Sequence, residues 1–326
     1  VIQRGNALLV RSVENGKRVR DRVNYQPTLF DLSPEPTGYV TLDGQHVKPN
    51  KRDSIKDAKE WLEQRQNQDI VFGNTQYPYC YISDQYPDDV PWDKDQLLIV
   101  TIDIEVECEN GFPNPEDAAE PMLSITMKNH QNKKIIVWGL HEFQNYRDDV
   151  DYRLCKDEDN LLMQFLDTWR AIDYPDIITG WNTEFFDIPY ICNRIKSVMG
   201  EDAMKRLSPW GVVNSRMVNS GYGRKDQVYD ILGVEEVDYL QLYRKFTYSA
   251  QESYRLDHIA FVELGERKDE NPYETFRDWY TKDYQSFLDY NIQDVELVDR
   301  LDDKMKLIDL ILTMTFEAKV NISDSF

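Results

Sequence analysis

Length, composition and charge exclude several classes of protein. The chain has 326 residues, of which 41% are hydrophobic and 30% charged, so it is expected to fold into about two domains rather than to be disordered. No apolar run approaches the roughly 20 residues of a membrane-spanning helix, and no membrane partner is expected. The net charge of −21 argues against a protein that wraps duplex DNA, but it is compatible with carboxylates gathered around metal ions. The four cysteines form no C-x-x-C pair, which favours a reducing, cytosolic compartment.

Residues 1–95 are expected to form a small α+β unit. The turn signal Asn15-Gly16 separates two runs that predict a hairpin. Ser54 precedes an apolar stripe of helical period and is expected to cap a helix. The expected elements are strands at 7–13 and 17–23 and a helix at 54–65. The stretch 76–93 is rich in proline, tyrosine and aspartate and is interpreted as the linker out of this unit.

Beyond this unit, buried strands begin to alternate with helices. The expected strands are 97–102, 122–127, 134–140, 176–180 and 237–239, and the expected helices are 157–170, 187–198 and a long one from residue 284 onward. A polar extended stretch at 212–234 predicts an exposed hairpin. This order describes an α/β domain in which a mixed sheet is flanked by helices. Its expected range is 96–306, and residues 307–326 are expected to form a helix that returns toward the amino-terminal domain.

Asp103 and Glu105 end the first of these strands and are two residues apart. Because side chains alternate between the faces of a strand, both carboxylates are expected on one face. Two anions side by side on a buried strand repel each other and lose hydration, and a cation would offset both effects. A metal site therefore competes with an exposed, charged strand end, and this motif alone does not decide between them.

Three further residues belong to two later segments. Asp187 lies in the first turn of an expected helix, where a carboxylate also complements the helix dipole. Tyr290 and Asp294 are four residues apart on the long helix and share one face. Each segment alone is also explained by ordinary helix capping or by a half-buried tyrosine beside an exposed acid.

Together, the three segments occur in an order that resembles the DEDDy 3′–5′ exonuclease family, which has a ribonuclease-H-like fold. The neighbouring residues resemble, more narrowly, the proofreading region of family B replicative DNA polymerases from T-even-like tailed phages, over nearly the whole chain. The segments that carry the resemblance are 25–30, 103–105, 111–113, 179–182, 186–190, 205–209 and 290–294. The palm segments of these polymerases, D-x-x-S-L-Y-P-S and D-T-D, do not occur in the sequence. The chain is therefore expected not to polymerise DNA by itself.

The resemblance implies hydrolysis assisted by two divalent metal ions, Mg²⁺ or Mn²⁺, roughly 4 Å apart. Asp103 is expected to bridge the ions. Glu105 and Asp187 are expected to complete their coordination, directly or through water. Asp294 is expected to hold the ion on the side of the attacking water, and Tyr290 to orient that water. The lack of nearby histidine or cysteine argues against zinc.

By the same resemblance, the substrate is a single-stranded or frayed DNA 3′ end. Phe112 and Phe186 are expected to stack on the last bases, although core packing explains them too. Asn182 is expected to contact the terminal nucleotide. Tyr222 and Gly223 lie in the expected hairpin, which matches one that helps to separate primer from template.

The expected partners are a polymerase domain, in the same chain or a separate one, and a sliding clamp that meets the full enzyme. The expected location is the cytoplasm of the infected bacterial host. Two alternatives stay open. The carboxylates do not distinguish DNA from RNA, so the chain could be a stand-alone exonuclease that acts on RNA. The amino-terminal domain could instead bind RNA through the basic stretch 17–22, for which a solvated strand face is the plainer explanation.

Overall fold

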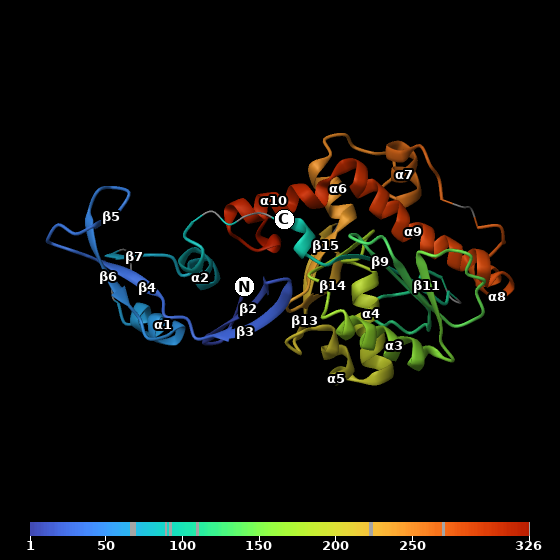
Figure 1. Ribbon diagram of the computed structural model, residues 1–326, viewed down its shortest axis with the longest axis horizontal. Coiled ribbons are helices and arrows are strands. Elements are labelled where there is room, and N and C mark those ends of the chain that lie inside the picture. Colours follow the sequence, from blue (N-terminus) through green and yellow to red (C-terminus); the bar gives the residue numbers. More distant parts are fainter. Residues whose placement is uncertain are drawn as a thin grey trace. The chain divides into compact units, whose positions relative to one another are not determined.

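The computed structural model describes residues 1–65, 70–88, 90, 93–108, 111–221, 224–268 and 271–325 (Figure 1). The chain divides into two compact units, residues 1–92 with 314–326, and residues 93–313. The domain ranges predicted from the sequence are 1–95, 96–306 and 307–326. These ranges remain predictions. Among the described residues, no helix combines the length and the apolar character needed to cross a membrane.

In the first unit, the described residues between 1 and 92 form two small antiparallel sheets and the helices α1 (Ile55–Glu63) and α2 (Tyr77–Gln85). One sheet has the order β1 (Ile2–Arg4), β2 (Ala7–Glu14), β3 (Lys17–Val23), and the other has the order β5 (Tyr39–Val40), β6 (His46–Lys51), β4 (Thr28–Leu32), β7 (Val71–Phe72). The predicted hairpin is confirmed, and the Ser54 hydroxyl caps α1 by accepting the Asp57 N–H. This unit is therefore α+β, as the pattern of its sequence predicts.

Helix α2 corrects the interpretation of residues 76–93 as a linker. Pro78 lies in the first turn of α2. Backbone N–H groups in the first turn have no acceptor within the helix, so proline loses no hydrogen bond there. Tyr77 is only 1% exposed and belongs to the hydrophobic cluster of this unit, against which Tyr81 also packs. These tyrosines are four residues apart, so they share one helical face. Burial of that face outweighs the weak helical preference of the segment.

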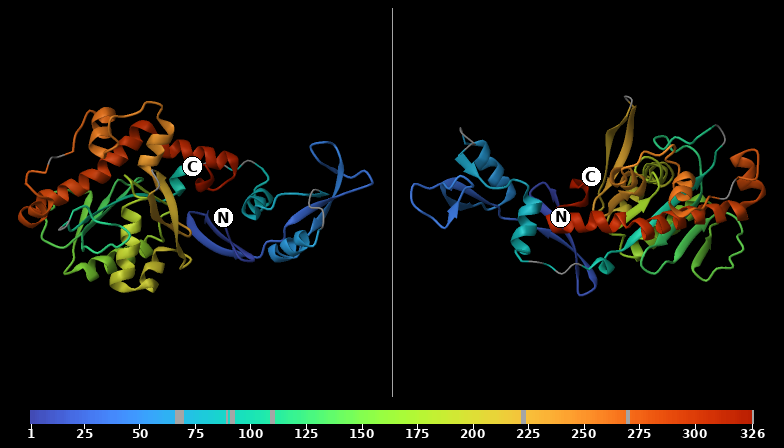
Figure 2. Two further views of the ribbon diagram at one scale, coloured as in Figure 1. Left: turned by 180° about the vertical axis from the view of Figure 1, so that it is seen from behind. Right: turned by 90° about the horizontal axis from the view of Figure 1, so that it is seen from above.

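The second unit is built on a six-stranded mixed sheet (Figures 1 and 2). Its order is β11 (Val150–Leu154), β10 (Ile135–Gly139), β9 (Met122–Asn129), β8 (Ile99–Val106), β12 (Ile177–Gly180), β15 (Glu235–Asp238). β9 runs antiparallel to both of its neighbours, β8 and β10. β12 and β15 continue parallel to β8, and β11 is parallel to β10. A hairpin of β13 (Val213–Gly221) and β14 (Arg224–Ile231) stands apart as a separate two-stranded sheet. The predicted α/β fold class, a mixed sheet flanked by helices, is confirmed.

Helices cover both faces of this sheet. Apolar side chains of α3 (Glu158–Ala171) and α4 (Asp187–Met199) form one core with β8 and β9, and side chains of α8 (Phe276–Lys282) and α9 (Tyr284–Met305) form another with β9, β10 and β11. The remaining helices are α5 (Glu201–Met204), α6 (Tyr239–Phe246), α7 (Leu256–Leu264) and α10 (Leu307–Ala318), with short 3-10 helices at Lys94–Gln96, Lys205–Leu207 and Ile322–Asp324. Helix α4 therefore lies over one face of β8, and α9 lies over the opposite face.

The helix predicted from Tyr284 onward is two helices rather than one. α9 ends at Met305, and Lys306 takes a left-handed conformation with φ of 56°. The buried Asp302 then accepts the N–H of Ile308 at the start of α10. No glycine or proline marks this break, so the sequence pattern continues across it.

Candidate active site

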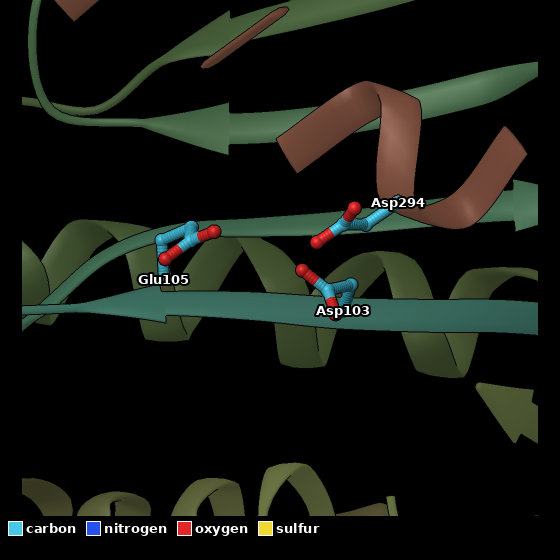
Figure 3. Close-up of side chains that lie close together, drawn as sticks. All are labelled: Asp103, Glu105 and Asp294. Carbon is cyan, nitrogen blue, oxygen red and sulfur yellow. The ribbon is translucent and has the colours of Figure 1, made fainter. Parts of the chain in front are cut away.

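The site begins on the face of β8 that looks toward α9. Asp103 and Glu105 lie two residues apart on this strand, as predicted, and α9 supplies a third carboxylate from Asp294 (Figure 3). One carboxylate oxygen of each residue lies within 4.8 Å of the others. Two strand residues and one helix residue, far apart in sequence, thus form a compact group of anions.

This group fits a divalent cation. Oδ1 of Asp294 is buried and has no hydrogen-bond partner in the described part of the chain, although a buried carboxylate oxygen normally has one. Carboxylate oxygens are the ligands that Mg²⁺ and Mn²⁺ prefer. The residues that could hold such an ion are therefore Asp103, Glu105 and Asp294.

Asp187 lies close to this group but outside it. It is in the first turn of α4 and is 3% exposed, and its Oδ1 accepts the Ile104 N–H at 3.1 Å. Its charge nevertheless contributes to raising the pKa of both Asp103 and Glu105. The structure thus brings three of the four predicted carboxylates together and directs one oxygen of the fourth to the backbone of β8.

Burial and mutual repulsion hold protons on these carboxylates when no metal is bound. Burial is the main cause that raises the pKa of Asp103 and Glu105 well above the usual range, and the charge of Asp294 adds to it. Burial also raises the pKa of Asp187 to about 8, in spite of the N–H donated by Ile104. A metal ion must displace these protons in order to bind.

We therefore expect metal-free stability and metal affinity to change in opposite directions with pH. In the unfolded chain these carboxyls ionise near pH 4, so between about pH 4 and 8 the folded state holds more protons than the unfolded state. The free energy of unfolding in EDTA should then fall as the pH rises from about 5 to 8, whereas Mn²⁺ affinity should rise. Urea unfolding and calorimetric titration at each pH measure both quantities. The slope of stability against pH should be shallower in Asp187→Asn, and an identical slope would contradict the raised pKa of Asp187.

Lys268 and Tyr290 complete the polar contacts of Asp294. Lys268 Nζ donates to Asp294 Oδ2 at 2.6 Å and to the Tyr290 hydroxyl at 2.5 Å, and its side chain is 13% exposed. Burial disfavours its charge, but Asp294 and Tyr290 outweigh burial and raise the pKa of Lys268 above its usual value. Burial also raises the pKa of Tyr290 to about 12, so its hydroxyl keeps its proton. Trp279 packs edge-on against the Tyr290 ring at 5.0 Å between centroids and fixes its direction.

The aromatic residues predicted to hold bases lie beside each other. The rings of Phe112 and Phe186 are 5.1 Å apart between centroids, and Phe112 is 84% exposed. Phe186 immediately precedes Asp187 at the start of α4. An exposed phenyl ring supported by a second ring offers a face on which a base could stack.

Asn182 follows β12 in a strained backbone conformation. Its φ is 70°, a value that asparagine tolerates better than most residues, and its N–H donates to Asp238 Oδ1 at 3.1 Å. The predicted hairpin is present as β13 and β14, but Tyr222 and Gly223 lie outside the described residues.

Comparison with known proteins identifies the family. Residues 36–259 match the family described as DNA polymerase family B, exonuclease domain, and this match covers more than half of the chain. The chain belongs to this family. Asp103, Glu105 and Asp187 of this family B chain lie within the matched residues, whereas Tyr290 and Asp294 lie beyond them.

Two phage enzymes are similar over the whole family B chain. It is 32% identical to the DNA-directed DNA polymerase of Enterobacteria phage T4, with 98% of this chain and 38% of the phage protein covered. It is 31% identical to the DNA-directed DNA polymerase of Escherichia phage RB69, with 100% and 39% covered. The DNA polymerase delta catalytic subunit of Candida albicans is 28% identical over 64% of this chain. The chain spans less than two fifths of the length of the two phage relatives.

Two residues that contact the carboxylates of this family B chain were not predicted from its sequence. Lys268 is one, and Asn291, which donates to Asp103 Oδ2 at 2.6 Å, is the other. Asn291 lies directly after Tyr290 in the 290–294 motif, but its contacts depend on how β8 pairs with β9, which the motif does not show. Lys268 stands between α7 and α8, and no pattern around it points to α9.

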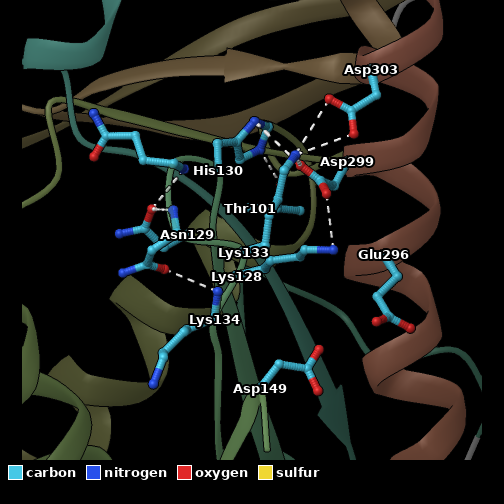
Figure 4. A network of polar contacts seen from close by, with 12 residues as sticks. Thr101, Lys128, Asn129, His130, Lys133, Lys134, Asp149, Glu296, Asp299 and Asp303 are labelled. Carbon is cyan, nitrogen blue, oxygen red and sulfur yellow. Dashed lines mark hydrogen bonds and ion pairs between the residues drawn. The ribbon is translucent and has the colours of Figure 1, made fainter.

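A second group of charged residues forms ion pairs between α9 and the sheet (Figure 4). Asp299 is 3% exposed and accepts from Lys128 Nζ at 2.9 Å and from Lys133 Nζ at 2.7 Å. Burial opposes the charge of Asp299, but the two lysines hold its pKa below the usual range. The His130 ring lies beside Asp299 at 3.7 Å, and burial lowers the pKa of His130 to about 4, which leaves the ring neutral at pH 7. Because α9 also carries Asp294, these ion pairs help to fix the register of the helix against the carboxylates of β8.

Proposed function

We propose that this chain is the 3′–5′ proofreading exonuclease portion of a phage family B DNA polymerase. The observation that carries the proposal is the group formed by Asp103, Glu105 and Asp294 in a chain of this family. The substrate would be the 3′ end of single-stranded or frayed primer DNA, and the reaction would be hydrolysis of the terminal phosphodiester.

The residues of the site would have different roles in this reaction. Asp103, Glu105 and Asp294 would hold the divalent ions, with Asp187 acting near them through its charge or through water. Two such ions, when bound, lower the pKa of a water molecule and stabilise charge on the leaving oxygen. The Tyr290 hydroxyl, which keeps its proton and has a fixed direction, would orient the attacking water.

The DNA end would be held by stacking rather than by base-specific contacts. Phe112 and Phe186 would stack on the last bases, which gives sequence-tolerant binding. Asn182 would contact the terminal nucleotide. The hairpin of β13 and β14, together with Tyr222 and Gly223, would help to separate primer from template. A polymerase domain, in the same chain or another, and a sliding clamp would be partners in the cytoplasm of the infected host.

The experiment that tests this function compares single-stranded DNA with RNA of the same sequence. Purified protein in Mg²⁺ should shorten the DNA faster than the RNA. Faster shortening of the RNA would favour a stand-alone exonuclease for RNA, and loss of neither strand in Mg²⁺ or Mn²⁺ would count against the activity of this chain.

Tyr290→Phe should reduce the rate of nuclease activity about 10- to 100-fold and leave metal affinity nearly unchanged. The variant loses a hydroxyl that orients water but keeps every carboxylate, so the loss should lie at or below the lower end of the roughly 10²–10⁴-fold that a positioned general acid or base contributes. Single-turnover rates at saturating Mg²⁺ measure the first quantity, and calorimetry measures the second. Because Lys268 also loses one of its acceptors, the thermal midpoint of the metal-free variant should be measured as a control. A rate equal to that of the wild type would exclude a role of the hydroxyl in the reaction.

A further inference from the structure

Hydroxyl groups lie opposite the carboxylates of β8. In the antiparallel register, Asp103 pairs with Thr126 and Glu105 pairs with Ser124 on β9. Directly opposed residues of two strands point to the same face, so two carboxylates and two hydroxyls stand side by side beneath α9. Ser124 and Thr126 have no exposed surface, and a buried hydroxyl normally needs a hydrogen-bond partner.

Both hydroxyls reach the same atom of α9. Ser124 Oγ donates to Oδ1 of Asn291 at 3.0 Å, and Thr126 Oγ1 donates to the same oxygen. On the other side of this amide, Nδ2 donates to Asp103 Oδ2 at 2.6 Å. Asn291 itself has no exposed surface. A fully buried amide thus connects two strand hydroxyls to one oxygen of the carboxylate.

These contacts leave the amide one orientation while Asp103 is ionised. A carboxylate can only accept, so the group that faces Asp103 must be the NH₂ of Asn291. The amide oxygen then faces β9, and both hydroxyls must donate to it. In the reversed orientation two acceptor oxygens would meet without a proton between them. The Asp103 carboxylate therefore sets this orientation, and the hydroxyls of Ser124 and Thr126 stabilise it by donating to the amide oxygen.

We propose that Ser124, Thr126 and Asn291 are positioning residues that hold the Asp103 carboxylate in the direction needed to bind a metal ion. The proposal rests on the proposed function only in taking a divalent ion as the ligand of this site. A carboxylate without this donor can rotate away from Asp294, and ordering it again opposes metal binding. Partners of this kind typically contribute about 10- to 100-fold to metal affinity without touching the ion.

The test measures Mn²⁺ affinity by isothermal titration calorimetry on the whole chain without DNA. Thr126→Val combined with Ser124→Ala removes both donors at little change of volume, and Asn291→Leu removes the amide. Both proteins should bind Mn²⁺ about 10- to 100-fold more weakly than the wild type. Thr126→Val alone should give a smaller loss, and Thr126→Ser, which keeps the hydroxyl, should bind Mn²⁺ as the wild type does.

Thr179→Val is the matched control. Thr179 is also fully buried in the same sheet, and its hydroxyl donates to the Val237 carbonyl oxygen at 2.6 Å, away from the carboxylates. This variant should lower the thermal midpoint and leave Mn²⁺ affinity unchanged. The proposal is overturned if the double variant binds Mn²⁺ like the wild type, or if Thr179→Val loses as much affinity as Thr126→Val.

DNA degradation in the same samples separates this proposal from the proposed function. Wild-type protein that degrades no DNA, while the double variant still loses Mn²⁺ affinity, would reject the nuclease and support the positioning role. Wild-type protein that degrades DNA, while all variants bind Mn²⁺ equally, would support the nuclease and reject the positioning role.

Discussion

Asp103→Asn should abolish nearly all metal-dependent degradation of single-stranded DNA, by about 10³-fold or more. A bound metal ion contributes several kcal/mol to stabilisation of the transition state, and each 1.4 kcal/mol corresponds to about tenfold in rate. The asparagine keeps the volume of the side chain and can still accept from Asn291, but it supplies no negative charge to a cation. Single-turnover degradation rates and Mn²⁺ titration measure the two consequences.

The stability of this variant separates loss of chemistry from loss of fold. Burial and, after it, repulsion among the carboxylates raise the pKa of Asp103 and Glu105 when no metal is present. Asp103→Asn removes part of the repulsion, so the metal-free variant should unfold at a temperature no lower than the wild type. Asp167→Asn is a suitable control, because Asp167 is 65% exposed and pairs with Arg206 on the surface. If Asp103→Asn protein degraded DNA at the rate of the control, the metal assignment would be wrong.

Lys268→Met should destabilise the metal-free protein by about 3–5 kcal/mol near pH 8, and Mg²⁺ should restore much of that loss. Lys268 and Asp294 form a pair that is largely shielded from water, and removal of one partner from such a pair leaves a buried charge without compensation. Methionine keeps the length of the side chain and removes the charge. A divalent ion on the same carboxylates would replace the missing positive charge. Urea unfolding with EDTA and with Mg²⁺ measures the effect.

Lys133→Met provides the control for this effect. Lys133 also pairs with aspartates of α9, but these are Asp299 and Asp303, which lie outside the three-carboxylate group. Its removal should lower stability equally with and without Mg²⁺. The interpretation of Lys268 as the internal counter-ion fails if Mg²⁺ stabilises the two variants to the same extent.

The fold of the second unit was largely predictable because its elements have strong periodic patterns. The strand from residue 97, the hairpin after residue 122 and the helices from residues 157 and 187 follow from apolar runs with clear ends. The short helices α6, α7 and α8 were not predicted, since few residues carry their pattern. Helix α2 was missed because burial of Tyr77 decides its conformation, and burial depends on contacts distant in sequence.

The candidate site was predictable where one local rule applies. The spacing of Asp103 and Glu105 places them on one face of any strand. The position of Asp294 beside them required the resemblance to a family, because nothing local shows which face of α9 meets β8. The contacts of Asn291 depend on the register of β8 with β9, and those of Lys268 depend on the path of a loop. Neither the register nor that path can be read from spacing along the chain.

The measurement that tests the central claim most directly is the degradation of single-stranded DNA labelled at its 5′ end, with Mg²⁺ and with excess EDTA. The proposed function predicts a ladder of labelled products that shortens progressively from the 3′ end, and its disappearance in EDTA and in Asp103→Asn. Release of the 5′ label as the first product, or a ladder that persists in EDTA, would contradict it.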